Sequence, residues 1–271
     1  MLRSLLLAVA CLALVASACS SDDGTDATVA ETTAPGAAPD TAPAPPDETT
    51  GDTEPPAEDS AETSEAASEA EPTGSSSTFT AEVWADNWFA MYANGELIGE
   101  DSVPITTERS FNAETFSFDA GYPLTIAIEA KDFKETDSGI EYIGLDNQQM
   151  GDGGLILQVI DDSTGEVVAV SDDSWTTLVI HQAPLNTECE KDADPDATCE
   201  SLILEAPEGW TMAEFDDAEW LPATIWSEAD VSPKDGYDEI AWDESAQLVW
   251  GTDLEVDNTV LLRTMAPAPQ E

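Results

Sequence analysis

The stretch ADNWFAMYANGELIG, residues 85–99, decides the fold class of this chain. Its apolar side chains alternate, so that Phe89 and Met91 point to the side opposite Trp88. This period of two is typical of a half-buried strand. Asn94–Gly95 follows, and these residue types best tolerate the positive φ that both central positions of a type I′ turn require. The stretch therefore predicts a β-hairpin.

The same alternation recurs along the second half of the chain. Phe79, Ala81, Val83 and Ala85 share one side of FTAEVWA, with Trp84 on the other. Further short alternating or apolar segments are YPLTIAIEA (122–130), GGLILQVID (153–161), EVVAVSD (166–172), WTTLVIHQ (175–182), SLILEA (201–206) and NTVLLRTMA (258–266). Gly, Pro, Asn and Asp separate them, and no long segment has a period of 3.6. This arrangement predicts an all-β sandwich or barrel.

The N-terminus has the pattern of an export signal. Residues 1–18 carry an early arginine and a short apolar run, too short for a membrane span. The run ends in small residues before Cys19, which resembles the lipobox of bacterial lipoproteins, although Ala16 stands where leucine is usual. The resemblance implies lipidation of Cys19 and anchoring to the outer face of the cell membrane. The alternative is an ordinary signal peptide cleaved nearby.

Residues 19–78 have the composition of a linker. They are rich in Pro, Ala, Ser, Thr, Asp and Glu and contain no aromatic residue. Such a segment cannot bury enough apolar surface to offset its ordering entropy, so we expect a disordered acidic stalk. Every Trp, Phe and Tyr lies at or beyond Phe79. We therefore expect one β-sandwich domain at 79–265 and a tail at 266–271.

Charge and cysteine content limit the partners and the compartment. The chain has 58 acidic residues against 7 basic ones, and 43 of the acids lie in residues 79–271. Such a surface repels nucleic acid and anionic lipid, so the only membrane association that we expect is through the lipid anchor. With Cys11 in the signal and Cys19 lipidated, Cys189 and Cys199 remain as an even pair in an exported chain, which predicts a disulfide.

Six motifs in order resemble those of galactose-binding-domain-like jelly rolls. The opening hairpin looks like the adD-f-lyvNG--vg motif of these β-sandwiches. The others are GYPLTIAIEAKDF, GDGGLILQVID, VSDDSWTT, APEGWTMAEFDDAEWLPAT and LVWGTDLEVDNTVLLR. The resemblance covers roughly residues 79–265 and implies a jelly-roll fold. It does not name a ligand, because this fold carries sugar-binding, protein-contact and purely structural roles.

The leading functional hypothesis is non-catalytic carbohydrate binding. An exposed aromatic ring would stack on a pyranose, and nearby polar side chains would bond its hydroxyls. The candidates, which include a polar loop that we expect to be exposed, are Trp84, Asp86, Asn87, Trp88, Asp146, Asn147, Gln148 and Gln149. The alternative is that the two tryptophans are core residues of a structural or protein-interaction module of the envelope.

A lesser hypothesis is calcium binding. Asp192, Asp194 and Asp196 stand at alternate positions between the two cysteines, a spacing that can converge on Ca²⁺. The calcium-loop pattern then fails, because Ala197 stands where glycine is needed, so a solvated acidic loop is the alternative. We expect no other cofactor and no enzymatic activity: His181 is the only histidine, and the nucleophile-elbow and phosphate-loop motifs are missing.

Overall fold

The computed structural model describes residues 76–105 and 111–269 of the 271-residue chain. The predicted signal peptide at 1–18, the lipidation site Cys19 and nearly all of the predicted linker lie outside the described residues. The described chain begins directly with a strand at Ser76, three residues before the expected domain start. Within these residues no helix is long and apolar enough to cross a membrane.

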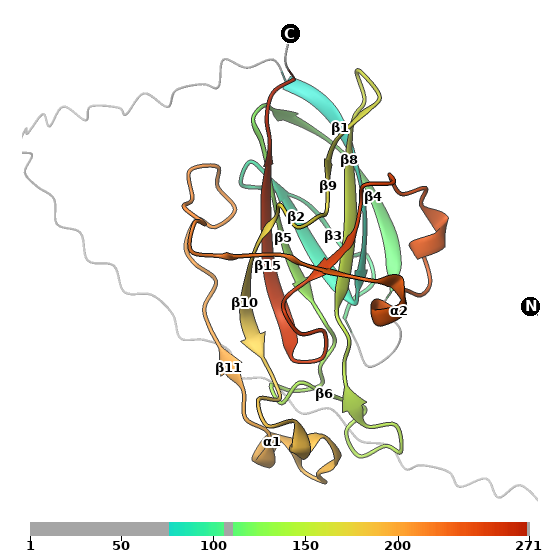
Figure 1. The fold of residues 1–271 in the computed structure, drawn as a ribbon, viewed down its shortest axis with the longest axis vertical. Helices are drawn as coiled ribbons and strands as arrows, with labels where there is room; N and C mark the ends of the chain where they lie inside the picture. The colour runs from blue at the N-terminus through green and yellow to red at the C-terminus, as the bar shows by residue number, and fades with distance from the viewer. Residues whose placement is uncertain (1–75, 106–110, 270–271) are drawn as a thin grey trace, which may run out of the picture. The chain divides into compact units, whose positions relative to one another are not determined.

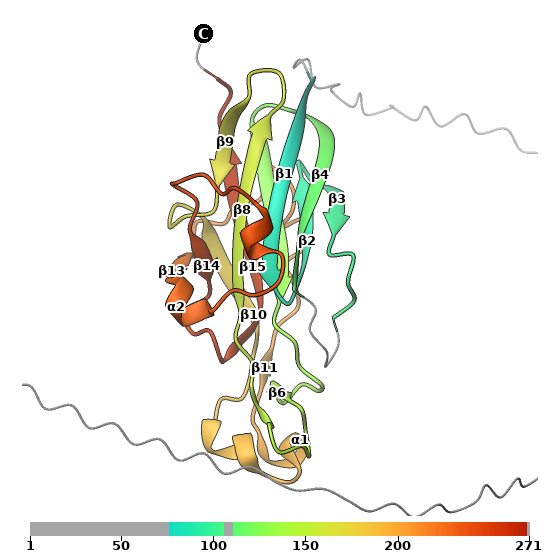
Figure 2. The same ribbon diagram turned by 90° about the vertical axis from the view of Figure 1, so that its right-hand side faces the viewer.

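Two antiparallel sheets form the body of the domain (Figures 1 and 2). The six-stranded sheet has the order β13-β14-β8-β1-β4, and β9 also pairs with β8. Its central strand β1 pairs with β4 along its whole length and with β8 over Phe79–Asp86. The strands of this sheet are β1 (Ser76–Asp86), β4 (Asn112–Gly121), β8 (Gly154–Asp161), β9 (Glu166–Val170), β13 (Thr224–Trp226) and β14 (Leu248–Trp250).

The seven-stranded sheet has the order β11-β10-β15-β5-β2-β3, with β12 also paired to β10. Its strands are β2 (Trp88–Ala93), β3 (Glu96–Glu100), β5 (Leu124–Lys131), β10 (Thr176–Gln182), β11 (Leu202–Ile203), β12 (Leu221–Pro222) and β15 (Asp257–Ala266). A small third sheet joins β6 (Ile140–Glu141) to β7 (Gln149–Met150). The predicted all-β class is therefore confirmed.

The alternating residues of both sheets meet in one apolar core. Phe79 and Val83 of β1, Ile126 of β5 and Val260 of β15 are fully buried members of this cluster. In the core, the backbone of Gly153 packs directly against the ring of Trp250, since a Cβ on Gly153 would lie 2.1 Å from Cε2 of Trp250. The large apolar area removed from water in this core is the main favourable contribution to folding.

The hairpin predicted from Asn94–Gly95 is present. Asn94 has φ +49° and Gly95 φ +89°, and Ala93 pairs with Glu96 across the turn. The side chain of Asn94 adds two hydrogen bonds, because its Nδ2 donates to the carbonyl of Gly121 and its Oδ1 accepts from the N–H of Thr125. The turn is thus tied to the neighbouring strand β5.

Short helical segments lie in the loops. They are η1 (Thr187–Lys191), α1 (Pro195–Thr198), α2 (Glu228–Val231) and η2 (Tyr237–Glu239). The predicted disulfide between Cys189 and Cys199 is confirmed, with 5.4 Å between the Cα atoms. It closes the loop that contains η1 and α1, beyond β10 (Figure 1). The bond holds this loop and does not touch the main core.

Candidate functional site

Trp84 does not provide the exposed ring that the sequence hypothesis requires. It is fully buried, and its indole Nε1 donates to the carbonyl of Asp235 at 3.0 Å. Tyr237 packs edge-on against the ring, with 5.6 Å between centroids. The segment around η2 covers this face of β1, so Trp84 is a core anchor and its expected role as a stacking platform is wrong.

Asp86 and Asn87, at the end of β1, are also buried. Asn87 Oδ1 accepts from the N–H of Phe133 at 2.5 Å, and its own N–H donates to the carbonyl of Lys131. Among the described residues Asp86 forms an ion pair with Lys234, whose Nζ lies 3.4 Å from Oδ2. Burial raises the pKa of Asp86 to about 8, against the opposing effect of Lys234. Neither side chain is placed to hold a surface-bound sugar.

Trp88 remains partly exposed on the outer face of the seven-stranded sheet. It lines a cavity of about 460 Å³, which we call the Trp88 groove, between β2, β5 and the segment after β3. Its partner across the strands is Lys131, whose ammonium lies 4.6 Å from the ring centroid. The lining residues are Trp88, Glu100, Asp101, Ser102, Pro104, Ile105 and Lys131.

Asp101 is the most unusual group in the groove. It is 4 % exposed, and burial raises the pKa of its carboxyl to about 7. Its Oδ1 accepts from the N–H of Val103 at 2.8 Å. Its buried Oδ2 has no hydrogen-bond partner among the described residues.

A second cavity of about 360 Å³ shares Ile105 and Lys131 with the Trp88 groove. It extends the hollow across the sheet toward the single histidine, His181. This ring is buried, and its Nε2 lies 3.3 Å from the carbonyl oxygen of Asp137. Burial lowers the pKa of His181, so the ring is neutral at neutral pH. The apolar part of the cavity wall comes from Ile105, Ile180, Ile203 and Leu204.

The polar loop residues are not brought together with Trp88 by any contact in the structure. Gln148 is buried, and its amide donates to the carbonyls of Glu190 and Asp192 in the disulfide loop. Its Oε1 accepts from the N–H of Gly144. Gln149 Nε2 donates to Glu141 Oε2. Asp146 and Asn147 are exposed, as the sequence predicts. Gln148 therefore links its own loop to the disulfide loop through hydrogen bonds.

The three aspartates of the predicted calcium loop do not form a site. Asp192, Asp194 and Asp196 are exposed, and Asp194 and Asp196 belong to the N-terminus of α1. In the part of the chain that the structure describes, no three His, Cys, Asp or Glu side chains are grouped so as to hold a metal ion. Because α1 begins between Asp194 and Asp196, the chain is not extended there, and the alternate positions do not bring the three carboxylates together.

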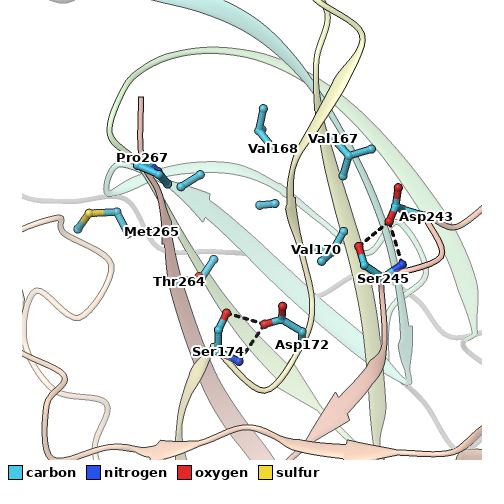
Figure 3. Close-up of a pocket in the computed structure, with 12 residues that line it drawn as sticks. Val167, Val168, Val170, Asp172, Ser174, Asp243, Ser245, Thr264, Met265 and Pro267 are labelled. Carbon is cyan, nitrogen blue, oxygen red and sulfur yellow. Dashed lines mark hydrogen bonds between the residues drawn. The ribbon is translucent and has the colours of Figure 1, made fainter. Parts of the chain in front are cut away.

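A third cavity, of about 300 Å³, lies between β9 and the end of β15 (Figure 3). One wall is the valine-rich strand β9. Two carboxylates face it, but Asp172 Oδ1 accepts from the hydroxyl and N–H of Ser174, and Asp243 Oδ1 does the same with Ser245 (Figure 3). With no aromatic ring in its lining, this cavity is less suited to a sugar than the Trp88 groove.

Comparison with known proteins places the chain in no family. No protein-family model matches it, and no curated protein or solved structure was found to be similar to it.

Sequence reasoning identified Trp88 but missed the rest of the groove. Lys131 and Asp101 lie 43 and 13 positions further along the chain and reach Trp88 only through strand pairing. The alternation along YPLTIAIEA and the following lysine placed Lys131 on the outer face of its strand, which was the available signal. It did not indicate which strand lies beside it.

Proposed function

We propose that this domain is a jelly roll of the galactose-binding-like type that binds carbohydrate without catalysis in the Trp88 groove. The observation that carries the proposal is a partly exposed indole in a cavity whose lining also contains the polar side chains of Asp101, Ser102 and Lys131. An aromatic ring packs against the C–H face of a pyranose, and a carboxylate accepts from its hydroxyls. Both requirements are met within one groove.

The remaining lining supports the same chemistry. The Lys131 ammonium covers part of the indole, so we place the pyranose on the exposed part of the ring. Lys131 and Ser102 then supply hydroxyl-bonding groups at the edge of the sugar. Glu129 lies 3.0 Å from Lys131 and holds the ammonium in place. The surplus of acidic residues favours a neutral sugar over an anionic one.

A glycan panel tests the proposal on the full chain. We expect saturable binding of at least one neutral glycan, lost at least tenfold in Trp88→Ala and weakened in Asp101→Asn. Trp88→Phe keeps an aromatic ring and should retain part of the affinity. Asp146→Asn is the matched control, since this exposed carboxylate makes no contact with the groove. No binding across the panel, or equal binding by Trp88→Ala, contradicts the proposal.

We also propose that the domain is displayed outside the cell on an acidic, disordered stalk and held by a lipid on Cys19. The support is the sequence of residues 1–78. In cells, Cys19→Ala should move the protein from the membrane fraction to the soluble fraction or the medium, and label from a radioactive fatty acid should disappear. Retention in the membrane without label would show another mode of anchoring.

A second candidate function is docking of an envelope protein on the β11 edge. Leu202, Ile203 and Leu204 are 43 %, 55 % and 45 % exposed in succession, and β11 is the last strand of its sheet. Exposed apolar residues at a sheet edge mark interaction surfaces. A photoreactive residue at position 203 should crosslink to a single protein in cells if this function holds. Crosslinks absent at 203, together with glycan binding, leave the first function alone.

A further inference from the structure

Four acidic residues from separate segments lie near one another, and two of them pair with a single lysine. They come from four segments: Asp86 ends β1, Asp132 follows β5, Glu141 is in β6 and Asp152 follows β7. The lysine is Lys234, three residues after α2. We call these five residues the Asp132 cluster. Lys234 pairs with both Asp86 and Asp152, and Asp132 packs against Gly151, the neighbour of Asp152. Burial raises the pKa of Asp132, and the charges of Asp86, Glu141 and Asp152 act in the same direction.

Asp132 is the most deeply buried acid of the cluster whose charge is not compensated by an ion pair within the described chain. It is 2 % exposed, and neither carboxylate oxygen has a hydrogen-bond partner among the described residues. The N–H of the next residue, Phe133, donates instead to Oδ1 of Asn87. Gly151 makes room for the carboxylate, since a Cβ there would lie 2.1 Å from Oδ2 of Asp132. The backbone of Phe133 lowers the pKa of this carboxyl only in part, so the buried group requires a compensating cation or proton.

Lys234 does not supply enough compensation. Its Nζ lies 3.4 Å from Oδ2 of Asp86 and 3.8 Å from Oδ1 of Asp152, and it makes no ion pair with Asp132 or Glu141. It is the only basic side chain in the described residues that forms an ion pair with any of the four carboxylates. One ammonium thus faces four acidic groups. Its side chain is 33 % exposed, so it has a path out to solvent.

We propose that the Asp132 cluster binds one divalent cation of the Ca²⁺ type, in competition with the ammonium of Lys234. Carboxylate oxygens are the ligands that Ca²⁺ prefers, and Ca²⁺ tolerates irregular geometry where Mg²⁺ demands an octahedron. As the structure stands, no three acidic side chains of the described residues surround one point. Binding therefore includes rotation of these carboxylates toward the ion and withdrawal of Lys234, and it releases the protons that the acids hold.

Calorimetric titration of the full chain with CaCl₂, after removal of metals by chelation, tests the proposal. We expect one site, weaker with MgCl₂, and a Ca²⁺-dependent rise in melting temperature. Asp132→Asn keeps the shape of the side chain and removes its charge, so it should fold and lose the site. Lys234→Gln removes the competing ammonium and should tighten Ca²⁺ binding several-fold. If Lys234 had only a structural role, Lys234→Gln would not increase the affinity for Ca²⁺.

Two further variants protect the interpretation. Glu141→Gln removes a second carboxylate and should also weaken Ca²⁺ binding. It tests the site independently if Asp132→Asn does not fold. The triple variant Asp192→Asn, Asp194→Asn, Asp196→Asn should bind Ca²⁺ like the wild type, because these exposed groups lie outside the cluster. The proposal is overturned by three outcomes: no Ca²⁺ binding in the wild type and in Lys234→Gln, unchanged binding in Asp132→Asn, or binding abolished by the triple variant alone.

Discussion

Trp84 and Trp88 lie on successive strands and have opposite environments. Trp84 is enclosed between the core and the segment near Asp235, with its N–H satisfied by a backbone carbonyl. Trp88 faces away from the core, and Lys131 is the cation beside its ring. Burial of a tryptophan removes a large apolar area from water, whereas a partly exposed one keeps that area available for a ligand. Trp84 therefore stabilises the core, and the ring of Trp88 is available for a ligand.

Truncation of these tryptophans should separate stability from binding. Trp84→Ala leaves a cavity and removes the hydrogen bond to the carbonyl of Asp235, and we expect a loss of about 3–5 kcal/mol in the free energy of unfolding. Trp88→Ala should cost about 1 kcal/mol or less, as is usual for changes outside the core. Urea unfolding followed by circular dichroism measures both. Equal losses in the two variants would show that Trp88 is also a core residue.

Asp86 makes stability depend on pH. Its folded-state pKa is about 8, raised from the usual 3.8, so the folded protein holds a proton that the unfolded chain releases. The unfolded state then binds fewer protons, and stability must fall as pH rises from about 4 to about 8. Glu141, with a pKa raised to about 7 by burial, and Asp132, whose pKa burial also raises, act in the same direction.

Asp86→Asn should reduce this pH dependence. The amide cannot ionise, so the decline in melting temperature between pH 4 and pH 8 should be shallower than in the wild type. Thermal unfolding at several pH values in the presence of a chelator measures it, and Asp146→Asn is the exposed control. Parallel curves for wild type and Asp86→Asn would show that the carboxyl of Asp86 does not carry the shift.

The turn between β2 and β3 connects the hairpin to a segment from a distant part of the chain. Residues 204–220 run from β11 toward β12 across the outer face of the seven-stranded sheet (Figure 1). Arg263 of β15 anchors them, since its guanidinium donates to the carbonyls of Met212 and Phe215 and pairs with Asp217 at 2.9 Å. Arg263 therefore has a structural role, in which its charge pairs with Asp217 and its N–H groups satisfy two backbone carbonyls.

Gly95→Ala tests the hairpin turn. A Cβ at this position would lie 2.3 Å from Sδ of Met212, and the residue has φ +89°. Strain at a left-handed position costs about 1–3 kcal/mol, so we expect a loss of that size in the free energy of unfolding. Gly121→Ala is the control, because its Cβ meets no atom within 4 Å and its φ is not positive. Similar stability of the two variants would contradict this account.

The disulfide loop should behave as a local unit. Reduction of Cys189–Cys199 removes a constraint worth about 2–3 kcal/mol for a loop of this length. Because Gln148 ties this loop to residues 144–148, hydrogen exchange should accelerate in both segments after reduction while the two sheets keep their protection. Exchange by mass spectrometry measures this. Loss of protection throughout the sheets would show that the bond supports the whole domain.

Across the whole molecule, electrostatic repulsion acts against folding. Residues 79–271 carry 43 acidic groups against 6 basic ones. Many of these acids are exposed, and the compact state brings them closer together than the unfolded chain does. Burial raises the pKa of Asp86 to about 8 and those of Asp101 and Glu141 to about 7, which reduces the negative charge that these groups carry at neutral pH. The remaining repulsion between exposed carboxylates is reduced by screening from ions in solution.

Added salt should therefore stabilise the protein. A change from 0.05 M to 1 M NaCl shortens the Debye length from above 10 Å to about 3 Å, which weakens repulsion between exposed carboxylates. We expect the melting temperature at pH 7 to rise by several degrees. No increase with NaCl would show that surface repulsion is unimportant for stability.

The sequence by itself determined the all-β class, the hairpin at Asn94–Gly95 and the faces of the strands, because period and turn chemistry are local properties. It also predicted the disulfide from the count of cysteines. The tertiary structure adds that Trp84 is covered by the segment near Asp235, that Trp88 lies beside Lys131 in a groove that Asp101 also lines, and that Asp132 is buried against Gly151. Each of these depends on which segments pair across long separations, and alternation along one strand carries no record of its neighbour.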